Sequence, residues 1–312
     1  MNNFLIKNIM NLIKIFTKKT MKKLYLMLGD TLISDSRKRY DDYKTLEEAE
    51  IRIFSQNGED GIIDYLIKKL EIKKPNFVEI GVGDYTESNT RYLYETYYGK
   101  GLIVDLISNL KDKVSKNVSL WKGNLQILEK GVNSKNIEEE ILNEVDFPID
   151  IFSIDIDGVD YWVIKNIKPK ISKIFILEFN PIFGAEKKVT IPNIDNFSRT
   201  EHHYSNLYFG ASLNAYIKLL EEKGFYLLGV NRLRNNAFFV NNNFKKEIYF
   251  KNIKDINVSG ATDYNFSESR DKSGNLSFLK KEKALSQIKE CDLIDLSNKK
   301  NEKIKVKDLY NI

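Results

Sequence analysis

The 312-residue chain contains very little cysteine, histidine and proline. Cys291 is its only cysteine, which excludes a disulfide within the chain and a cysteine-rich metal site. Such a chain suits the reducing cytoplasm, where we expect this protein to reside. Only five prolines occur, and no low-complexity segment is present, so a long proline-rich linker is excluded. The length and the 42% of hydrophobic residues suit one large domain with terminal additions.

The chain also lacks the broad basic surface that a nucleic-acid partner requires. Its net charge is +5, but residues 1–23 alone contain six lysines, and no acidic residue precedes Asp30. Without these six charges the remainder of the chain sums to −1. We therefore expect no nucleic-acid partner.

The N-terminal segment is apolar at helical spacing between residues 4 and 16, but asparagine and lysine interrupt the pattern. The apolar run is too interrupted to span a bilayer, and no small-residue cleavage site follows it. We expect residues 1–54 to form a basic amphipathic extension. Residues 4–23 would rest on an anionic membrane surface at the inner membrane face. The alternatives are a helix that packs on the domain, or a dispensable leader, since Met21 could also serve as a start, and we favour these alternatives over membrane contact.

Short apolar segments alternate with helical patterns in the middle of the chain. We predict parallel strands at 77–80, 101–105, 118–121, 149–155 and 173–178, with helices that include 86–97, 134–143 and 160–166. A helix at 211–223 precedes two more strands, 225–230 and 237–240, which only a short turn joins. This order predicts a doubly wound, mostly parallel Rossmann-like α/β sheet whose last strand is antiparallel. The domain would span residues 55–248, and residues 249–312 would form a polar C-terminal extension with one helix near 280–290.

The first two predicted strands end in residues that suit a nucleoside cofactor. Glu79, Gly81 and Gly83 stand at the end of the first strand, where glycines let the backbone approach a ligand closely. Asp105 ends the second strand, where one carboxylate can accept hydrogen bonds from both hydroxyls of a ribose. Each feature alone also fits an ordinary strand-to-helix turn, and the third glycine of the dinucleotide fingerprint is missing. Their combination favours cofactor binding.

Acidic residues follow the next two strands at the same edge of the predicted sheet. Asp155 and Asp157 follow the fourth strand, and Glu178 ends the fifth. These oxygen atoms would hold a divalent cation, or position an acceptor hydroxyl and the amino-acid end of a cofactor; we favour positioning over metal binding. Asp157 and Asp160 also suit the cap of the helix that follows. We expect one of Asp155 and Asp157 to face the active site.

The two histidines of the chain, His202 and His203, are adjacent in a long irregular segment, residues 181–209. Histidine suits general-base catalysis near neutral pH, but neighbouring residues seldom point in one direction. At most one of them would therefore be catalytic, and a pair on a surface loop is the alternative. We assign the base to Asp155 or His203, with Asp157 as a further catalytic candidate.

Taken together, these motifs resemble the class I S-adenosylmethionine-dependent methyltransferases, and among them the FkbM-type branch. The resemblance covers about residues 52–241, and the matching segments are Ser55–Asp60, Phe77–Gly83, Val104–Asp105, Ser153–Tyr161, Glu178–Pro181, Gly210–Leu213 and Asn236–Val240. It implies a seven-stranded methyltransferase sheet with an antiparallel last strand. It also implies that Glu79, Gly81 and Gly83 line the methionine and ribose region and that Asp105 takes the ribose hydroxyls. Gln56 and Asp60 would cover S-adenosylmethionine from the other side.

The acceptors of this family vary, and its bacterial members often accompany genes for surface polysaccharides. The resemblance therefore implies O-methylation of a sugar or another small molecule. Two other functions stay open. The first is a nicotinamide-dependent oxidoreductase, against which the incomplete glycine fingerprint argues. The second is a non-catalytic ligand-binding or scaffold protein on a methyltransferase fold, against which the intact strand-end acids argue.

Overall fold

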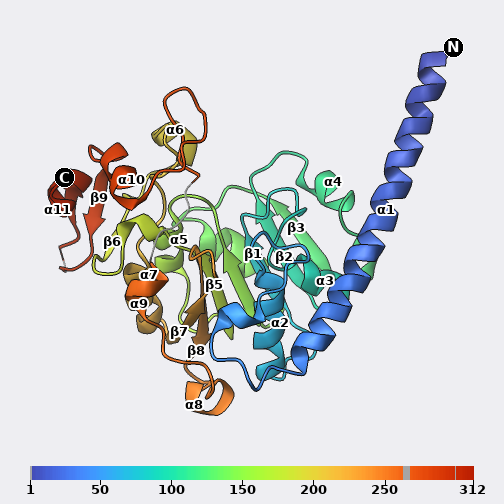
Figure 1. The fold of residues 1–312 in the computed structure, drawn as a ribbon, viewed down its shortest axis with the longest axis horizontal. Helices are drawn as coiled ribbons and strands as arrows, with labels where there is room; N and C mark the ends of the chain where they lie inside the picture. Colours follow the sequence, from blue (N-terminus) through green and yellow to red (C-terminus); the bar gives the residue numbers. More distant parts are fainter. Residues whose placement is uncertain (1, 263–267, 299) are drawn as a thin grey trace.

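The computed structural model describes residues 2–262, 268–298 and 300–312, with side chains from Thr20 onward. A seven-stranded sheet forms its centre, in the order β3-β2-β1-β4-β5-β8-β7 (Figure 1). The strands are β1 (Phe77–Ile80), β2 (Gly101–Asp105), β3 (Leu125–Glu129), β4 (Ile151–Ile154), β5 (Ile174–Glu178), β7 (Phe225–Val230) and β8 (Asn236–Asn241). The last strand of this sheet along the chain, β8, is antiparallel to both of its neighbours, β5 and β7. The predicted fold class, a mostly parallel Rossmann-like sheet of the methyltransferase type, is confirmed.

Helices cover both faces of the sheet because the side chains of each strand alternate between two hydrophobic cores. Val78 and Phe152 belong to one core, whereas Phe77 and Ile151 belong to the other. The helices of the first core are α5 (Asp160–Asn166) and α7 (Leu213–Glu222), and those of the second are α2 (Glu59–Lys69), α3 (Arg91–Tyr97) and α4 (Leu110–Ser115). All four residues of β1 and of β4 are buried, as expected of strands that are covered on both faces.

The prediction of a third strand at residues 118–121 is wrong. A short 3-10 turn, η2 (Leu120–Lys122), lies there, and Trp121 is 85% exposed. The strand at this place in the sheet is β3, which begins at Leu125. It lies at the edge of the sheet and its side chains are half-buried, so its sequence does not form the continuous apolar run of an inner strand.

Two predicted helices begin later or differ in type. The helix expected from residue 86 begins at Arg91, since residues 88–90 bind the carboxylate of Glu79. The helix expected at 134–143 is a π-helical turn, η3 (Ile137–Ile141), which continues into a 3-10 turn, η4 (Leu142–Glu144).

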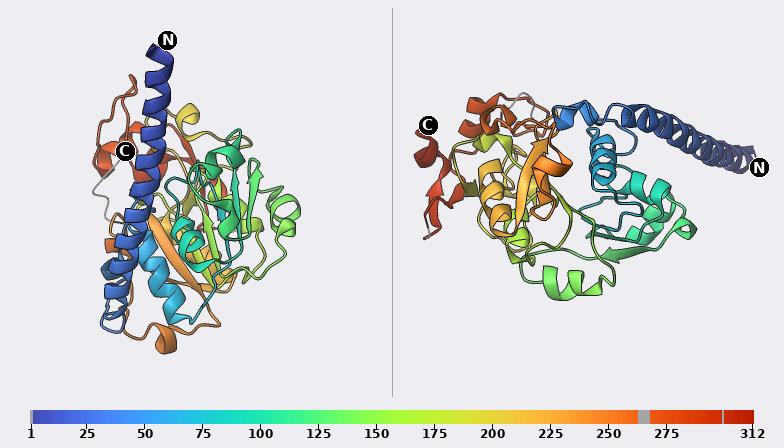
Figure 2. Two further views of the ribbon diagram at one scale, coloured as in Figure 1. Left: turned by 90° about the vertical axis from the view of Figure 1, so that its right-hand side faces the viewer. Right: turned by 90° about the horizontal axis from the view of Figure 1, so that it is seen from below.

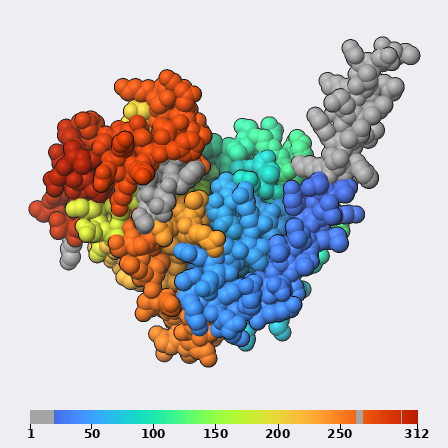
Figure 3. Space-filling model, viewed as in Figure 1, coloured from blue at the N-terminus to red at the C-terminus, as the bar shows by residue number. Residues whose placement is uncertain are grey.

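The C-terminal region packs into the body of the protein. The strands β9 (Asp292–Asp295) and β10 (Glu302–Lys305) form a small antiparallel sheet with β6 (Val189–Thr190). Leu293, Ile288 and Val306 are buried in the first core. The helix predicted near 280–290 is confirmed as α10 (Lys281–Gln287), and α8 (Lys246–Tyr249), α9 (Val258–Ala261) and α11 (Val306–Tyr310) complete the region. Figure 3 shows these residues, in orange and red, spread from the upper left of the molecule to its lower edge.

The N-terminal extension begins with a long helix, α1 (Asn2–Arg37), and a 3-10 turn, η1 (Leu46–Ala49), follows it. Figure 2 shows the later part of α1 lying along the edge of the body. Ile33 is buried there against Phe54 and Tyr92. Side chains 2–19, which carry most of the predicted amphipathic pattern, lie outside those that the structure describes. Among the described residues, we find no helix with the length and apolar character required to cross a bilayer.

Candidate active site

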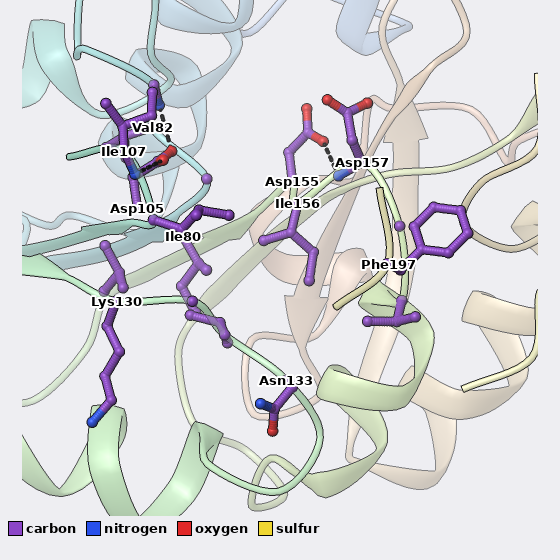
Figure 4. Close-up of a pocket in the computed structure, with 18 of the residues that line it drawn as sticks. Ile80, Val82, Asp105, Ile107, Lys130, Asn133, Asp155, Ile156, Asp157 and Phe197 are labelled. Carbon is purple, nitrogen blue, oxygen red and sulfur yellow. Dashed lines mark hydrogen bonds between the residues drawn. The ribbon is translucent and has the colours of Figure 1, made fainter. Parts of the chain in front are cut away.

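A cavity of about 730 Å³ opens at the carboxyl ends of β1, β2 and β4 (Figure 4). This is where the sheet switches direction, because β2 pairs with one side of β1 and β4 pairs with the other. Ligands bind at such switch points in open α/β sheets. The lining residues follow the strand ends, and they include Gly81–Asp84, Asp105–Ile107, Lys130–Asn133 and Asp155–Val159, together with Gln56, Ile194, Asn196 and Phe197.

The two glycines after β1 have different roles in this wall. Gly81 has a positive φ of 84°, and a Cβ atom there would lie 1.6 Å from the backbone oxygen of Asp155. The first glycine is thus required for β1 and β4 to approach each other. Gly83 has a φ of 56°, and a Cβ atom there would meet nothing within 4 Å. Because Gly83 has no side chain, only its backbone forms this part of the cavity wall.

Asp105 lies on the cavity wall at the end of β2, and the backbone holds its carboxylate in place. The N–H of Gly83 donates to Oδ2 at 2.7 Å, and the N–H of Ile107 donates to Oδ1 at 2.9 Å. Each oxygen has a second lone pair that remains able to accept a hydrogen bond. The arrangement suits a group that offers two adjacent hydroxyls, as a ribose does.

The structure places only one of the two residues predicted to cover the cofactor at the cavity. Gln56 lines it, whereas Asp60 is buried and accepts hydrogen bonds from the N–H groups of Ile53, Phe54 and Ser55. Burial raises the pKa of Asp60 to about 6. The carboxylate of Asp60 thus holds the turn that precedes Gln56 and does not line the cavity.

Glu79, which was expected to line the cofactor site, also lies outside the cavity. It is 4% exposed and is not among the residues that line the described cavity. Its carboxylate accepts hydrogen bonds from the hydroxyl of Ser88 and from the N–H groups of Asn89 and Thr90. Burial raises the pKa of Glu79. The residue holds the loop before α3 from behind the cavity wall.

Three carboxylates meet beside the cavity, and two of them, Asp155 and Asp157, belong to residues that line it. Oxygen atoms of Asp155, Asp157 and Glu178 lie within 4.8 Å of one another. Figure 4 shows the side chains of Asp155 and Asp157 pointing the same way from the loop after β4. The deep position of Asp155 among protein atoms, and then repulsion from Glu178, raise the pKa of Asp155, although its side chain stays open to solvent. Burial likewise raises the pKa of Glu178.

Arg199, at the start of α6 (Arg199–His202), is a residue of this site that sequence reasoning missed. Its guanidinium forms an ion pair with Asp157, and its Nε donates to the backbone oxygen of Asn206 at 2.8 Å. It also stacks over the ring of Phe209, 3.6 Å from the centroid. Attraction to Glu178 and Asp157 raises the pKa of Arg199 despite its burial. One cation therefore stands beside three acids and offsets part of their negative charge.

An amide network connects Glu178 to the start of α2. Asn235 Nδ2 donates to Glu178 at 3.5 Å, and Asn231 Nδ2 donates to the side-chain oxygen of Asn235 at 2.8 Å. Asn231 and Asn236 also donate to the buried carboxylate of Glu59, at 3.0 and 2.7 Å. The network fixes the turn between β7 and β8 against the segment that carries Gln56.

The structure does not bring His203 into the cavity. Its Nδ1 lies 2.6 Å from the hydroxyl of Ser205, its ring packs on Tyr204, and partial burial lowers its pKa. His202 is the closer of the pair, because it stacks on the cavity residue Phe197 with 4.4 Å between ring centroids. In this arrangement His203 does not line the cavity, whereas Asp155 does, so the geometry favours Asp155 of the two predicted bases.

Neither a protein-family model nor a curated protein matches the sequence. Solved structures with a similar fold include PKMT2 from Rickettsia typhi in complex with AdoHcy (14% identity, 59% of this chain and 52% of that chain, TM-score 0.38). They also include an S-adenosylmethionine-dependent methyltransferase from Clostridium acetobutylicum ATCC 824 (10% identity, 58% and 88%, TM-score 0.36). A third is an O-methyltransferase family protein from Burkholderia thailandensis (12% identity, 70% and 70%, TM-score 0.33). Similarity at this level concerns the fold and assigns no residue a role.

Proposed function

We propose that this chain is an S-adenosylmethionine-dependent methyltransferase that methylates a hydroxyl of a sugar or polysaccharide precursor. The observation that supports the cofactor most strongly is the fixed carboxylate of Asp105 beside the bare wall at Gly83, at the switch point of the sheet. In this proposal the ribose hydroxyls donate to Asp105. Ile107 and Val132, whose apolar side chains line the same cavity, would contact the base, and Gln56 would face the amino-acid end.

When bound, S-adenosylmethionine supplies a methyl group on a positively charged sulfur. The task of the chain is then to align an acceptor oxygen with that methyl group and to remove the hydroxyl proton. The carboxylate of Asp155 would take the proton of the acceptor hydroxyl. A raised pKa makes this carboxylate a better proton acceptor than an ordinary aspartate.

The acid cluster supports an acceptor that is rich in hydroxyls. Asp155, Asp157 and Glu178 offer several acceptor oxygens within a small space, and a sugar ring presents several neighbouring O–H donors to such a set. Arg199 supplies a positive charge to the cluster, so the proposal includes no metal ion.

Calorimetric titration with S-adenosylmethionine and S-adenosylhomocysteine tests the cofactor. We expect micromolar binding that Asp105→Ala abolishes. Asp112→Ala is the matched control, because it removes an exposed acid on the neighbouring helix α4 and changes the net charge equally. Binding of NADH without S-adenosylmethionine would favour an oxidoreductase, and binding of neither by the folded protein would favour a scaffold.

The base is tested with Asp155→Asn, followed by release of S-adenosylhomocysteine over a panel of nucleotide sugars. We expect turnover to fall by at least about 100-fold, the usual scale of general-base catalysis, while cofactor affinity stays near that of the parent. Loss of cofactor binding in this variant would show that Asp155 holds the cofactor and would contradict its assignment as a base.

A further inference from the structure

The outer face of α1 carries an apolar stripe that nothing in the described chain covers. Met21, Leu24, Tyr25, Leu28 and Leu32 are between 44% and 57% exposed. Their spacing places them on one side of the helix. The side turned to the body is a different one, and it carries Leu26, Gly29 and Ile33. Five large apolar side chains in one row are more than the scattered exposed residues of an ordinary surface.

The helix that bears this stripe is held firmly to the body. Lys22 forms an ion pair with Glu95 and donates to the backbone oxygen of Asn117 at 3.1 Å. One helical turn or more away, Tyr92 donates to Asp30 at 2.9 Å. Arg37 binds Asp64 at the end of the helix. The stripe is thus presented in a fixed orientation along the edge of the molecule that Figure 2 shows.

The charge of the same segment indicates the partner. Residues 1–23 contain six lysines, and the first acidic residue of the chain is Asp30. Lys23 is exposed next to the stripe. Apolar side chains beside lysines, with an aromatic ring among them, are typical of a helix that lies in the interface of an anionic bilayer.

We propose that this face of α1 binds the surface of a membrane that contains anionic lipid. The apolar stripe enters the boundary between headgroups and acyl chains, and Lys23, together with the lysines that precede Lys22 in the sequence, binds the lipid phosphates. The proposal does not depend on the proposed methyltransferase activity, because it concerns another face of the molecule and is read out by binding to lipid alone.

Flotation of the full chain with vesicles tests the proposal. We expect binding to vesicles of phosphatidylcholine with phosphatidylglycerol, little binding to phosphatidylcholine alone, and weaker binding at high salt. Leu24→Ser combined with Leu28→Ser should weaken binding by more than about tenfold, since two buried aliphatic chains are lost. Lys23→Gln should weaken it by about fivefold, the effect of one charge near an anionic surface.

Ile248→Ser is the matched control, because Ile248 is also an exposed aliphatic residue, at 67%, but lies on another helix, α8. We expect it to bind as the parent does, and thermal unfolding should show that all variants are folded. Equal binding to neutral and anionic vesicles, or unchanged binding by the double variant, would overturn the proposal. Light scattering adds a further arm: a dimer that the double variant dissociates, without any vesicle binding, would make the stripe an interface between two copies and would also overturn it.

Discussion

Gly81 and Gly83 are two residues apart, yet a methyl group would have very different surroundings at each position. At Gly81 it would collide with the backbone of Asp155, and at Gly83 it would enter open space. We expect Gly81→Ala to lower the free energy of unfolding by more than about 2 kcal/mol, because both φ and the contact are unfavourable. Gly83→Ala should cost about 1 kcal/mol, from its positive φ alone. Urea unfolding of the two variants measures the difference.

The two glycine substitutions also distinguish an effect on folding from an effect on cofactor binding. Gly83→Ala should fold and yet bind S-adenosylmethionine more weakly than the parent, since its methyl group occupies the cavity. Equal destabilisation by the two substitutions would contradict the close approach of β1 and β4 at Gly81.

A second residue-scale prediction concerns the pH dependence of turnover. Asp155 accepts a proton only when it is ionised, so activity should rise with pH through its raised pKa, above the ordinary range of an aspartate near about 4. Arg199 lowers the pKa of both Asp155 and Glu178 by its charge. Arg199→Gln should therefore move the acidic limb of the pH–rate profile to higher pH.

Arg232→Gln serves as the control for this profile, because it removes an equal charge from an exposed pair with Glu50, outside the acid cluster. Its acidic limb should stay where the parent has it. A limb that moves to lower pH in Arg199→Gln would show that another group governs the rate.

The residues of the cavity were predictable where they directly follow a strand. Gly81, Gly83, Asp105, Asp155 and Asp157 all line it, because the end of a parallel strand determines the edge of the sheet at which the next residues lie. Two kinds of residue were not predictable. The strand of Glu79 directs its side chain into a core behind the wall, which depends on how residues 88–90 fold over it. Arg199 pairs with Asp157, 42 residues earlier in the chain, and it lies in the irregular segment 181–209, which has no periodic pattern.

At the scale of elements, the junction of α1 with α2 depends on one buried carboxylate. Asp64 is fully buried and accepts hydrogen bonds from Arg37 at 2.7 and 2.9 Å, from Tyr40 at 2.7 Å and from Tyr97. Asp64→Ala leaves these donors without their acceptor. We expect a loss of about 3 kcal/mol in the free energy of unfolding, the scale for breaking a buried ion pair, measured by urea titration.

The exposed pair Asp35–Lys38 on the same segment is the comparison. Lys38→Ala should change the free energy of unfolding by less than about 0.5 kcal/mol, because solvent screens such pairs. A small effect of Asp64→Ala, similar to that of Lys38→Ala, would show that α1 is not anchored through this carboxylate.

Elements were predictable where burial on both faces forces a continuous apolar run, as in β1, β4 and β5. The position of β3 was predicted wrongly because an edge strand need not form a continuous apolar run. The bulky apolar residue Trp121, which is exposed, made residues 118–121 look like a strand instead. The helix α3 starts later than its pattern indicates, since the hydrogen bonds of Ser88 to Thr90 with Glu79 compete with a helical turn. Local pattern thus determined the type of most elements but not their ends.

At the scale of the whole molecule, residues 249–312 looked like a polar appendage because their apolar residues are few and scattered. The structure uses those few residues in the main core, and β9 pairs with β6 about 100 residues earlier in the chain. Such pairing depends on a surface that only the folded domain creates, so no local pattern indicates it. The segment after β6 continues to Ile194 and Phe197, which line the cavity. The C-terminal strands therefore support one wall of the candidate site.

Removal of residues 291–312 tests this arrangement. The truncation deletes Leu293, Leu296 and Val306 from the core and leaves β6 without its partner. Each buried aliphatic side chain contributes about 1.5–3 kcal/mol, so the loss exceeds about 4 kcal/mol, a large part of the stability of a typical domain. We expect a much lower temperature of thermal unfolding and weaker binding of S-adenosylmethionine. Deletion of only the exposed residues Asn311 and Ile312 is the control and should leave both unchanged. A truncated chain that unfolds at the temperature of the parent would show instead that the C-terminal region is a separable extension.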